Sequence, residues 1–189
     1  MSFIKKFSDS AKELSKVQAI AVCAMMLALR IVLGIFANFS LSFIPLPVIK
    51  VSLTFIPVML TGYLFGPVCA AVVAGAGDVF SYMLAPTALG FNPGITLCYI
   101  IEGLIYGVCL YHTELKLMNL IIAKAADLLI CTVTLQSYVL QLLFFQNVPL
   151  YTIMMYRSFV LVPMAILEIV LILIIKKPLG NVQKQLHKV

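Results

Sequence analysis

Seven ionisable side chains interrupt the long apolar stretches of this sequence. They are Arg30, Asp78, Glu102, Lys124, Asp127, Arg157 and Glu168. An ionised side chain at the centre of a bilayer costs roughly 2.5–3.5 kcal/mol on insertion scales, so each of these groups needs an internal partner or a ligand. The chemistry that they offer is ion pairing and the binding of a polar molecule, and their pattern indicates a transport or ligand pathway.

One group of charges belongs to the outer half of the membrane when both termini are placed inside. It contains Arg30, Asp78 and Arg157, with Lys50 at the outer edge. Guanidinium groups offer a planar fork of donors that suits carboxylates, whereas Asp78 or Asn92 can accept from amino or ring N–H groups. In a second interpretation, Arg30, Asp78 and Arg157 simply neutralise one another, which does not exclude ligand binding.

Other polar and aromatic side chains gather at the same outer ends and loops, where they fit a flat, polar, partly anionic molecule. Phe39, Phe43, Tyr82 and Phe91 are candidates for stacking on a ring. The predicted binding set is Arg30, Lys50, Asp78, Tyr82, Phe91, Asn92, Thr96 and Arg157.

On the same topology, the remaining charges are placed at the centre or in the inner half of the membrane. Lys124 and Asp127 are three residues apart, so they share one helical face and can neutralise each other locally. Glu168 lies at a similar depth, which favours a structural network. Glu102 is placed at mid-membrane beside two glycines, where it either faces the ligand or is protonated against a neighbouring helix; the sequence leaves both open.

Helices must position these groups. The chain has 189 residues, of which 63% are hydrophobic and 11% charged, a composition typical of an integral membrane protein. A helix needs ~20 residues to cross a ~30 Å core, so six or seven crossings fit. We predict an all-α bundle of six transmembrane helices in a single domain. The predicted spans are 17–38, 51–64, 67–84, 94–112, 118–145 and 153–175.

Lysines predict the orientation. Lys5, Lys6, Lys12 and Lys16 precede the first span, and Lys176, Lys177, Lys184 and Lys188 follow the last. Such residues concentrate in cytoplasmic segments, so we expect both termini to be cytoplasmic, with an amphipathic segment over 1–16, the bundle over 17–175 and a basic tail over 176–189. Topology and anionic lipid account for the net charge of +6, and nothing in it requires nucleic acid.

Small residues at four-residue spacing let membrane helices approach closely. Internal packing is the favoured interpretation for Gly62 with Gly66 and for Gly103 with Gly107. The alanine-rich surface of the first span, which includes Ala24 and Ala28, also suits docking to another membrane protein.

An enzymatic alternative rests on Gly75-Ala76-Gly77-Asp78, which matches the GxGD pattern of intramembrane aspartyl proteases. Those enzymes need two carboxylates that share a proton. Asp9 lies outside the membrane and Asp127 lies deeper than Asp78, so the protease remains the weaker hypothesis. The sequence contains no P-loop, CxxC pair or metal-ligand spacing, and we expect no enzyme activity, cofactor or metal.

Two stretches carry a family pattern: VSLTFIPVMLTGYLFG over 51–66, and GAGDVFSYMLAPTALGFNPGITLCYIIEGLIYG over 75–107. They resemble the substrate-binding S components of energy-coupling factor (ECF) vitamin transporters, and among these the folate-specific one. The resemblance implies a subunit in a bacterial plasma membrane that captures folate from outside. It also implies a transmembrane coupling protein and two ATPase subunits as partners, whose ATP hydrolysis tips the S component over in the bilayer.

The resemblance also distributes roles among the residues. It places Ala24 and Ala28 at the contact with the coupling protein. For folate, Arg30, Arg157 and Lys50 would meet the carboxylates, and Asp78 and Asn92 would meet the pterin. An S component for pantothenate or a pyridoxine-type vitamin is the alternative within the family.

Overall fold

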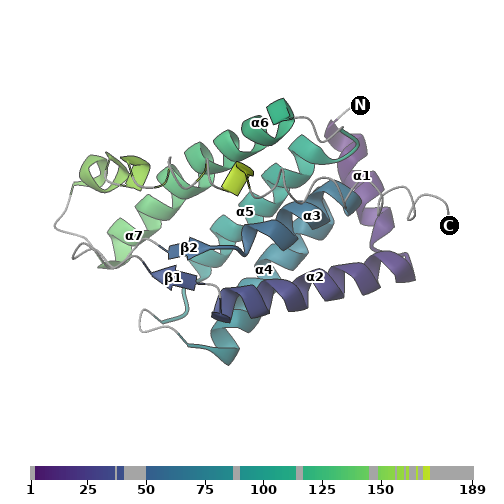
Figure 1. Ribbon diagram of the computed structural model, residues 1–189, viewed down its shortest axis with the longest axis horizontal. Coiled ribbons are helices and arrows are strands. Elements are labelled where there is room, and N and C mark those ends of the chain that lie inside the picture. The colour runs from purple at the N-terminus through teal and green to yellow at the C-terminus, as the bar shows by residue number, and fades with distance from the viewer. Residues whose placement is uncertain are drawn as a thin grey trace.

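The computed structural model is a helical bundle with one short hairpin (Figure 1). It describes residues 3–36, 38–40, 50–86, 90–113, 117–144, 149–155, 157–159, 161, 165 and 168–170. The elements are α1 (Phe3–Glu13), α2 (Val17–Phe36), β1 (Asn38–Ser40), β2 (Lys50–Ser52), α3 (Phe55–Phe65), α4 (Pro67–Leu84), α5 (Pro93–Leu110), α6 (Leu117–Asp127), the π-helix η1 (Leu128–Leu135) and α7 (Gln136–Phe144).

Four helical stretches are long and apolar enough to cross a membrane, and they coincide with four predicted spans. They are Val17–Phe36, Pro67–Leu84, Pro93–Leu110 and Met118–Leu142, the last of which runs through α6, η1 and α7. Helix α3 has 11 residues, which at ~1.5 Å per residue is too short to cross a bilayer upright. Within the last predicted span, residues 157–159 and 168–170 are helical, and much of the remainder lies outside the described residues.

The structure confirms the predicted all-α class and adds one short hairpin, which the sequence did not predict, after the C-terminal end of α2. There β1 and β2 pair antiparallel, with Asn38 opposite Ser52, Phe39 opposite Val51 and Ser40 opposite Lys50. The predicted second span began at residue 51, but β2 occupies 50–52 and α3 starts at Phe55. Phe39 and Val51 are of residue types that favour an extended backbone, and they are register partners in this pair.

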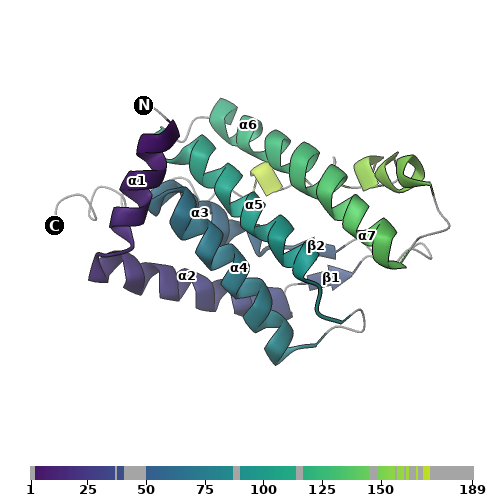
Figure 2. The ribbon, with the colours of Figure 1, turned by 180° about the vertical axis from the view of Figure 1, so that it is seen from behind.

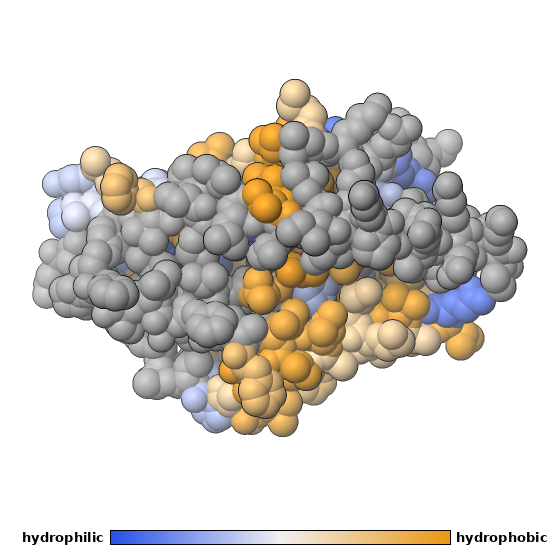
Figure 3. All heavy atoms as spheres, in the orientation of Figure 1, coloured by the Kyte–Doolittle hydropathy of each residue, from blue (hydrophilic) through white to orange (hydrophobic). Residues whose placement is uncertain are grey.

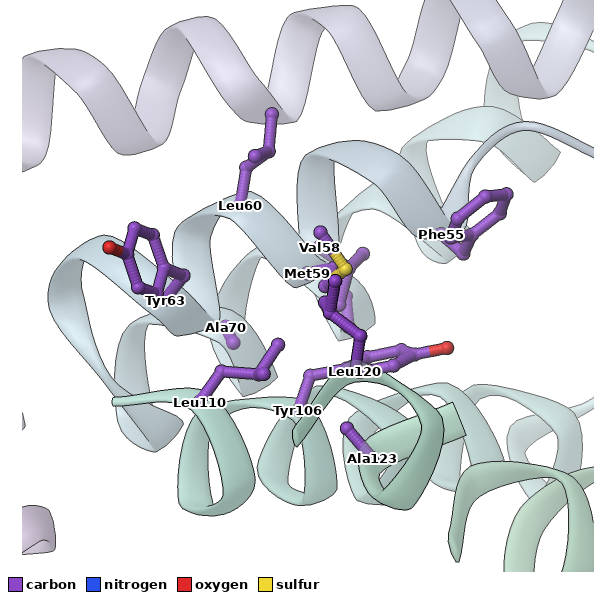
Figure 4. Close-up of a cluster of buried hydrophobic side chains, with 11 residues drawn as sticks. Phe55, Val58, Met59, Leu60, Tyr63, Ala70, Tyr106, Leu110, Leu120 and Ala123 are labelled. Carbon is purple, nitrogen blue, oxygen red and sulfur yellow. The ribbon is translucent and has the colours of Figure 1, made fainter. Parts of the chain in front are cut away.

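Helices α3, α4 and α5 form the core, which Figure 4 shows. A Cβ on Gly107 would come within 2.2 Å of the Cα atom of Pro67, and one on Gly103 within 2.7 Å of the Ala70 carbonyl oxygen. These glycines therefore serve internal packing, as their spacing predicts. The buried side chains around them include Phe55, Val58, Met59, Leu60, Tyr63, Tyr106, Leu110 and Leu120.

Helix α1 closes one end of the bundle, opposite the hairpin (Figure 2). Gly66 precedes α4 with φ of +90°, a conformation that suits glycine, and it offers α4 no capping side chain. Ser10 supplies the cap instead, because its Oγ accepts from the backbone N–H groups of Val68 at 3.1 Å and Cys69 at 3.4 Å. Lys6 donates to the carbonyl oxygen of Val108 at 2.8 Å near the C-terminus of α5. Thus α1 satisfies polar groups at the ends of two neighbouring helices.

The outward surface of α2 is apolar. Figure 3 shows hydrophobic side chains over this part of the molecule. Val17, Met25 and Phe36 are 81%, 68% and 80% exposed, as expected for side chains that contact lipid or another membrane protein. Ala24 and Ala28 are exposed among them.

Candidate functional site

Arg30 is held between α2, α4 and α5, although it is a charged residue in an apolar helix. Its side chain is 3% exposed, its Nη1 donates to the carbonyl oxygen of Val73 at 3.2 Å, and its guanidinium carbon lies 4.9 Å from the ring centroid of Tyr99. Gly77 makes room for it, because a Cβ there would come within 2.7 Å of the arginine. The Nε atom of Arg30 is buried and has no hydrogen-bond partner within the described structure.

Asp78 links α4 to the start of α5. Thr96 donates through Oγ1 to Asp78 Oδ2 at 2.7 Å. Asn92 begins α5 as its N-cap, with Oδ1 accepting from the backbone N–H of Gly94 at 2.8 Å, and Pro93 occupies the first helical position. This local capping fixes where α5 starts, and so brings Thr96 level with Asp78.

Two aromatic rings come from the same two segments as this polar pair. Tyr82, at the end of α4, and Phe91, just before α5, have ring centroids 5.4 Å apart and planes inclined by 49°. Phe91 is 46% exposed. The pair offers an aromatic surface next to hydrogen-bonding groups, which suits a flat heteroaromatic ring.

Among these residues, Arg157 has the most hydrogen-bond donors without a partner in the described structure. Its side chain is 5% exposed, and its Nη2 donates to Gln136 Oε1 of α7 at 2.8 Å. Both Nε and Nη1 are buried without a hydrogen-bond partner in the described part of the chain. A buried charged donor left unpaired costs about 1–3 kcal/mol or more, so an acceptor that bonds to these two atoms would be stabilised here. A carboxylate fits a guanidinium edge of this kind.

Tyr99 was missed by sequence reasoning. Its ring centroid lies 4.9 Å from the guanidinium carbon of Arg30. Its spacing of three residues from Thr96, on the same face of α5, is a signal that would have found it. Gln136 was also missed, although a glutamine inside an apolar span is itself a marker. We call Arg30, Asp78, Thr96, Tyr99, Gln136 and Arg157 the outer cluster.

The predicted set is thus only partly brought together by described contacts. Asp78, Asn92 and Thr96 are linked, and Tyr82 contacts Phe91. Arg30, Asp78 and Arg157 were alternatively expected to neutralise one another, yet their described hydrogen bonds go to Val73, Thr96 and Gln136, respectively. Lys50 lies on β2, and its side chain is outside the described residues, as is the candidate ring Phe43.

The deeper charges form a compact network, which confirms the predicted pairing of Lys124 with Asp127. Lys124 Nζ lies 3.0 Å from Asp127 Oδ2 and 2.7 Å from Glu168 Oε2, and it donates to the Tyr106 hydroxyl at 3.1 Å. Tyr106 donates to Asp127 Oδ2 at 3.0 Å. We call these four residues the inner network. It joins α5, α6 and the segment at residues 168–170.

The sequence is similar to those of known membrane transport proteins. A family model described as the substrate-specific component of ECF transporters matches residues 18–180. The folate transporter FolT of Clostridium novyi (strain NT) is 31% identical over 130 residues, which cover 69% of this chain and 72% of that protein.

Two solved structures share the fold. A crystal structure of FolT bound with folic acid superposes with a TM-score of 0.71 and 27% identity, covering 82% of this chain and 88% of the other. The S component for biotin from an ECF-type ABC transporter superposes with a TM-score of 0.64 at 21% identity, over 86% of this chain and 91% of the other.

Proposed function

This chain belongs to the substrate-specific components of ECF transporters, and from that premise we propose that it captures folate at its outer cluster. Its family is one of membrane transport subunits and not of enzymes. Folate is proposed because the relative in Clostridium novyi is named a folate transporter and a solved structure with the same fold holds folic acid.

The proposal rests on Nε and Nη1 of Arg157, which are buried and have no hydrogen-bond partner among the residues that the structure describes. Folate has a dicarboxylate tail, a flat aromatic middle and a pterin with amide-like donors and acceptors. Arg157 would take a tail carboxylate, with Arg30 and Lys50 as further cationic candidates. Asp78 and Asn92 are the candidates for the pterin.

Aromatic side chains would hold the flat part of the ligand. Tyr82 and Phe91 already form an aromatic pair, and Tyr99 lies against the Arg30 guanidinium. Stacking on such rings adds about 0.5–1.5 kcal/mol to a contact beyond simple burial. This division of roles accounts for the mixture of arginines, one carboxylate and several rings.

Six membrane crossings with both termini in the cytoplasm are the topology we propose, in the plasma membrane of a bacterium. Four membrane-length helices, the shorter α3 and the helical residues near the C-terminus support the count. The lysines of α1 support a cytoplasmic location for that helix. The outer cluster would then open to the outside, where the vitamin is collected.

The partners we propose are a transmembrane coupling protein and two ATPase subunits, since the chain itself contains no P-loop. Ala24 and Ala28 lie exposed on α2, where their small side chains permit close approach of a partner helix. An Ala28→Trp change should block uptake and leave folate binding intact. The matched control is Leu29→Trp, because Leu29 is exposed beside it but already large. Unimpaired uptake by the Ala28 variant would refute this contact.

Calorimetric titration of the purified protein with folate tests the ligand, with pantothenate and pyridoxine as competitors. We expect saturable binding of one folate per chain without the ATPase subunits. Binding of a competitor in its place would keep the family and overturn the vitamin. An unchanged folate affinity in an Arg157→Ala variant would overturn the proposed site even if folate binds.

A further inference from the structure

The π-helix η1 separates a residue of the inner network from a residue of the outer cluster. Helices α6 and α7 run on through η1 as one membrane-length helix (Figure 2). Asp127 is the last residue before η1, and Gln136 is the first residue after it. A π-helix of eight residues is unusual, and π turns occur frequently at functional sites. Because η1 lies between these two residues, it sets how α7 is rotated relative to α6.

The rotation brings two polar side chains to one side of the helix. Asp127 accepts from Tyr106 of α5, and Gln136 accepts from Arg157. The two residues are nine positions apart. Nine residues make about 2.5 turns of an α-helix, which would put them on opposite faces. A π-helix has about 4.4 residues per turn, so nine residues make about two turns and return to the same face.

The pattern of burial shows the same shift independently. In an uninterrupted α-helix, residues seven and eleven positions after Cys131 would share its face. Cys131 is 1% exposed, yet Tyr138 and Leu142 at those positions are 52% and 55% exposed. Ser137 and Leu140 are buried in their place. The inward face of α7 is therefore displaced along the sequence relative to that of α6.

Two hydrogen bonds span the wide turns of η1. The backbone N–H of Gln136 donates to the carbonyl oxygen of Cys131, five residues earlier. The Oγ1 atom of Thr134 donates to the carbonyl oxygen of Leu129 at 2.6 Å, again across five residues. In an α-helix, a threonine hydroxyl reaches the carbonyl three or four residues before it. Thr134 is exposed, and a hydroxyl in a membrane span needs such an internal acceptor. Its side chain thus stabilises the π geometry.

We propose that Gln136 is a positioning residue for ligand binding: it holds the Arg157 guanidinium through Nη2 and leaves Nε and Nη1 for a ligand carboxylate, and η1, stabilised by Thr134, places it there. The bond from Nη2 to Gln136 Oε1 is 2.8 Å long. A neutral amide oxygen accepts from the guanidinium without cancelling its charge, which stays available to an anionic ligand. This inference rests on the proposed function of Arg157.

A double-mutant cycle tests the positioning role, with the Kd of folate measured by calorimetry on the full-length protein in detergent. Gln136→Ala should raise the Kd about tenfold in the wild-type background, because the guanidinium loses a hydrogen bond that holds it in place. In the Arg157→Ala background the same change should alter the Kd less than about twofold, since a residue that acts through another has no effect once that residue is gone. Equal effects in the two backgrounds would overturn the positioning role.

The Arg157→Ala variant by itself separates this inference from the proposed function. If it binds folate as tightly as the wild type, the proposed folate site fails. If it binds folate more weakly and Gln136→Ala keeps its full effect in both backgrounds, only the positioning role fails.

A second ligand gives an answer even where the double variant binds folate too weakly to measure. Folate with both tail carboxylates converted to amides keeps its size and rings but offers no anion to Arg157. Gln136→Ala should weaken the binding of folate about tenfold and leave the Kd of the diamide within about twofold. A glutamine with a merely structural role would affect both ligands equally. That result, or an unchanged Kd of folate, would overturn the proposal.

Thr134→Val tests the role of η1, because valine keeps the branched shape and removes the hydroxyl. We expect the Kd of folate to rise about threefold in the wild-type background and to stay unchanged in the Gln136→Ala background. Thr132→Val is the matched control, since Thr132 lies in the same π-helix, whereas the described side-chain bond across the wide turn is that of Thr134. An unchanged Kd in Thr134→Val, or an equal rise in the control, would overturn the part assigned to Thr134.

Discussion

The outer cluster and the inner network both bury positive charge within the bundle, but they satisfy it differently. Lys124 has three oxygen partners for the three donors of its ammonium group. Arg157 is equally buried, yet two of its donor atoms have no partner among the described residues. Burial of charge alone therefore does not identify a binding site. Donors without a partner are the better indication, because the charged groups of a structural ion network bond to one another.

The two regions should therefore respond differently to mutation. Changes in the inner network should lower stability and leave ligand affinity largely intact. Changes in the outer cluster should lower affinity and leave the stability of the ligand-free protein largely intact. Each of the following experiments measures both quantities.

The largest loss of stability is expected for Lys124→Ala. It removes the cation between Asp127 and Glu168, and truncating one member of a buried ion network costs about 3–5 kcal/mol of unfolding free energy. Denaturation in mixed micelles measures it. Lys16→Ala is the control, because Lys16 pairs with Glu13 at an exposed position, where such pairs contribute about 0–1 kcal/mol. Equal losses in the two variants would contradict the structural role of the inner network.

Arg157→Ala should produce the largest loss of affinity. Truncating a buried charged partner of a ligand costs about 2–5 kcal/mol of binding free energy, which calorimetry detects as a rise of Kd of at least tenfold. Arg157→Lys keeps the charge but not the planar fork, so its loss should be intermediate. The unfolding free energy of the ligand-free protein should change little. If Arg157→Ala lowered the unfolding free energy but bound folate normally, the assignment of the two regions would be reversed.

The smallest effect is expected at the end of the bundle closed by α1. Ser10→Ala removes the hydroxyl that caps α4, and loss of a helix cap costs about 0.5–2 kcal/mol. Thermal unfolding measures it, and folate affinity should not change. Ser8→Ala is the matched control, since Ser8 is exposed on the same helix. A loss of affinity at Ser10 would show that the two regions are not separable.

Some of these residues can be placed correctly from the sequence, and others cannot. Local signals placed the start of the fourth span at residue 94, one residue after the observed start of α5 at Pro93, and predicted the pairing of Lys124 with Asp127, because both depend on neighbours along one helix. Hydrogen-bond partners on other helices could not be predicted from the sequence. Depth alone grouped Arg30 and Arg157, but their hydrogen bonds to Val73 and Gln136 depend on how each helix is rotated about its axis.

The class of protein and the approximate positions of four membrane-length helices follow from the sequence alone, because hydrophobic length and composition act locally. The same pattern anticipates the burial of Arg30, Glu102, Lys124, Asp127, Arg157 and Glu168, whereas Asp78 is only partly buried. Which of these charges have hydrogen-bond partners depends on the tertiary structure. Helix packing brings Tyr106 and Glu168 to Lys124 and places Ser10 at the start of α4. Within the described residues, it leaves Arg157 Nε, Arg157 Nη1 and Asp127 Oδ1 without a hydrogen-bond partner. The physical reason is that hydrogen bonds need distances near 3 Å and aligned atoms, which the packing of separate helices sets and spacing within one helix does not.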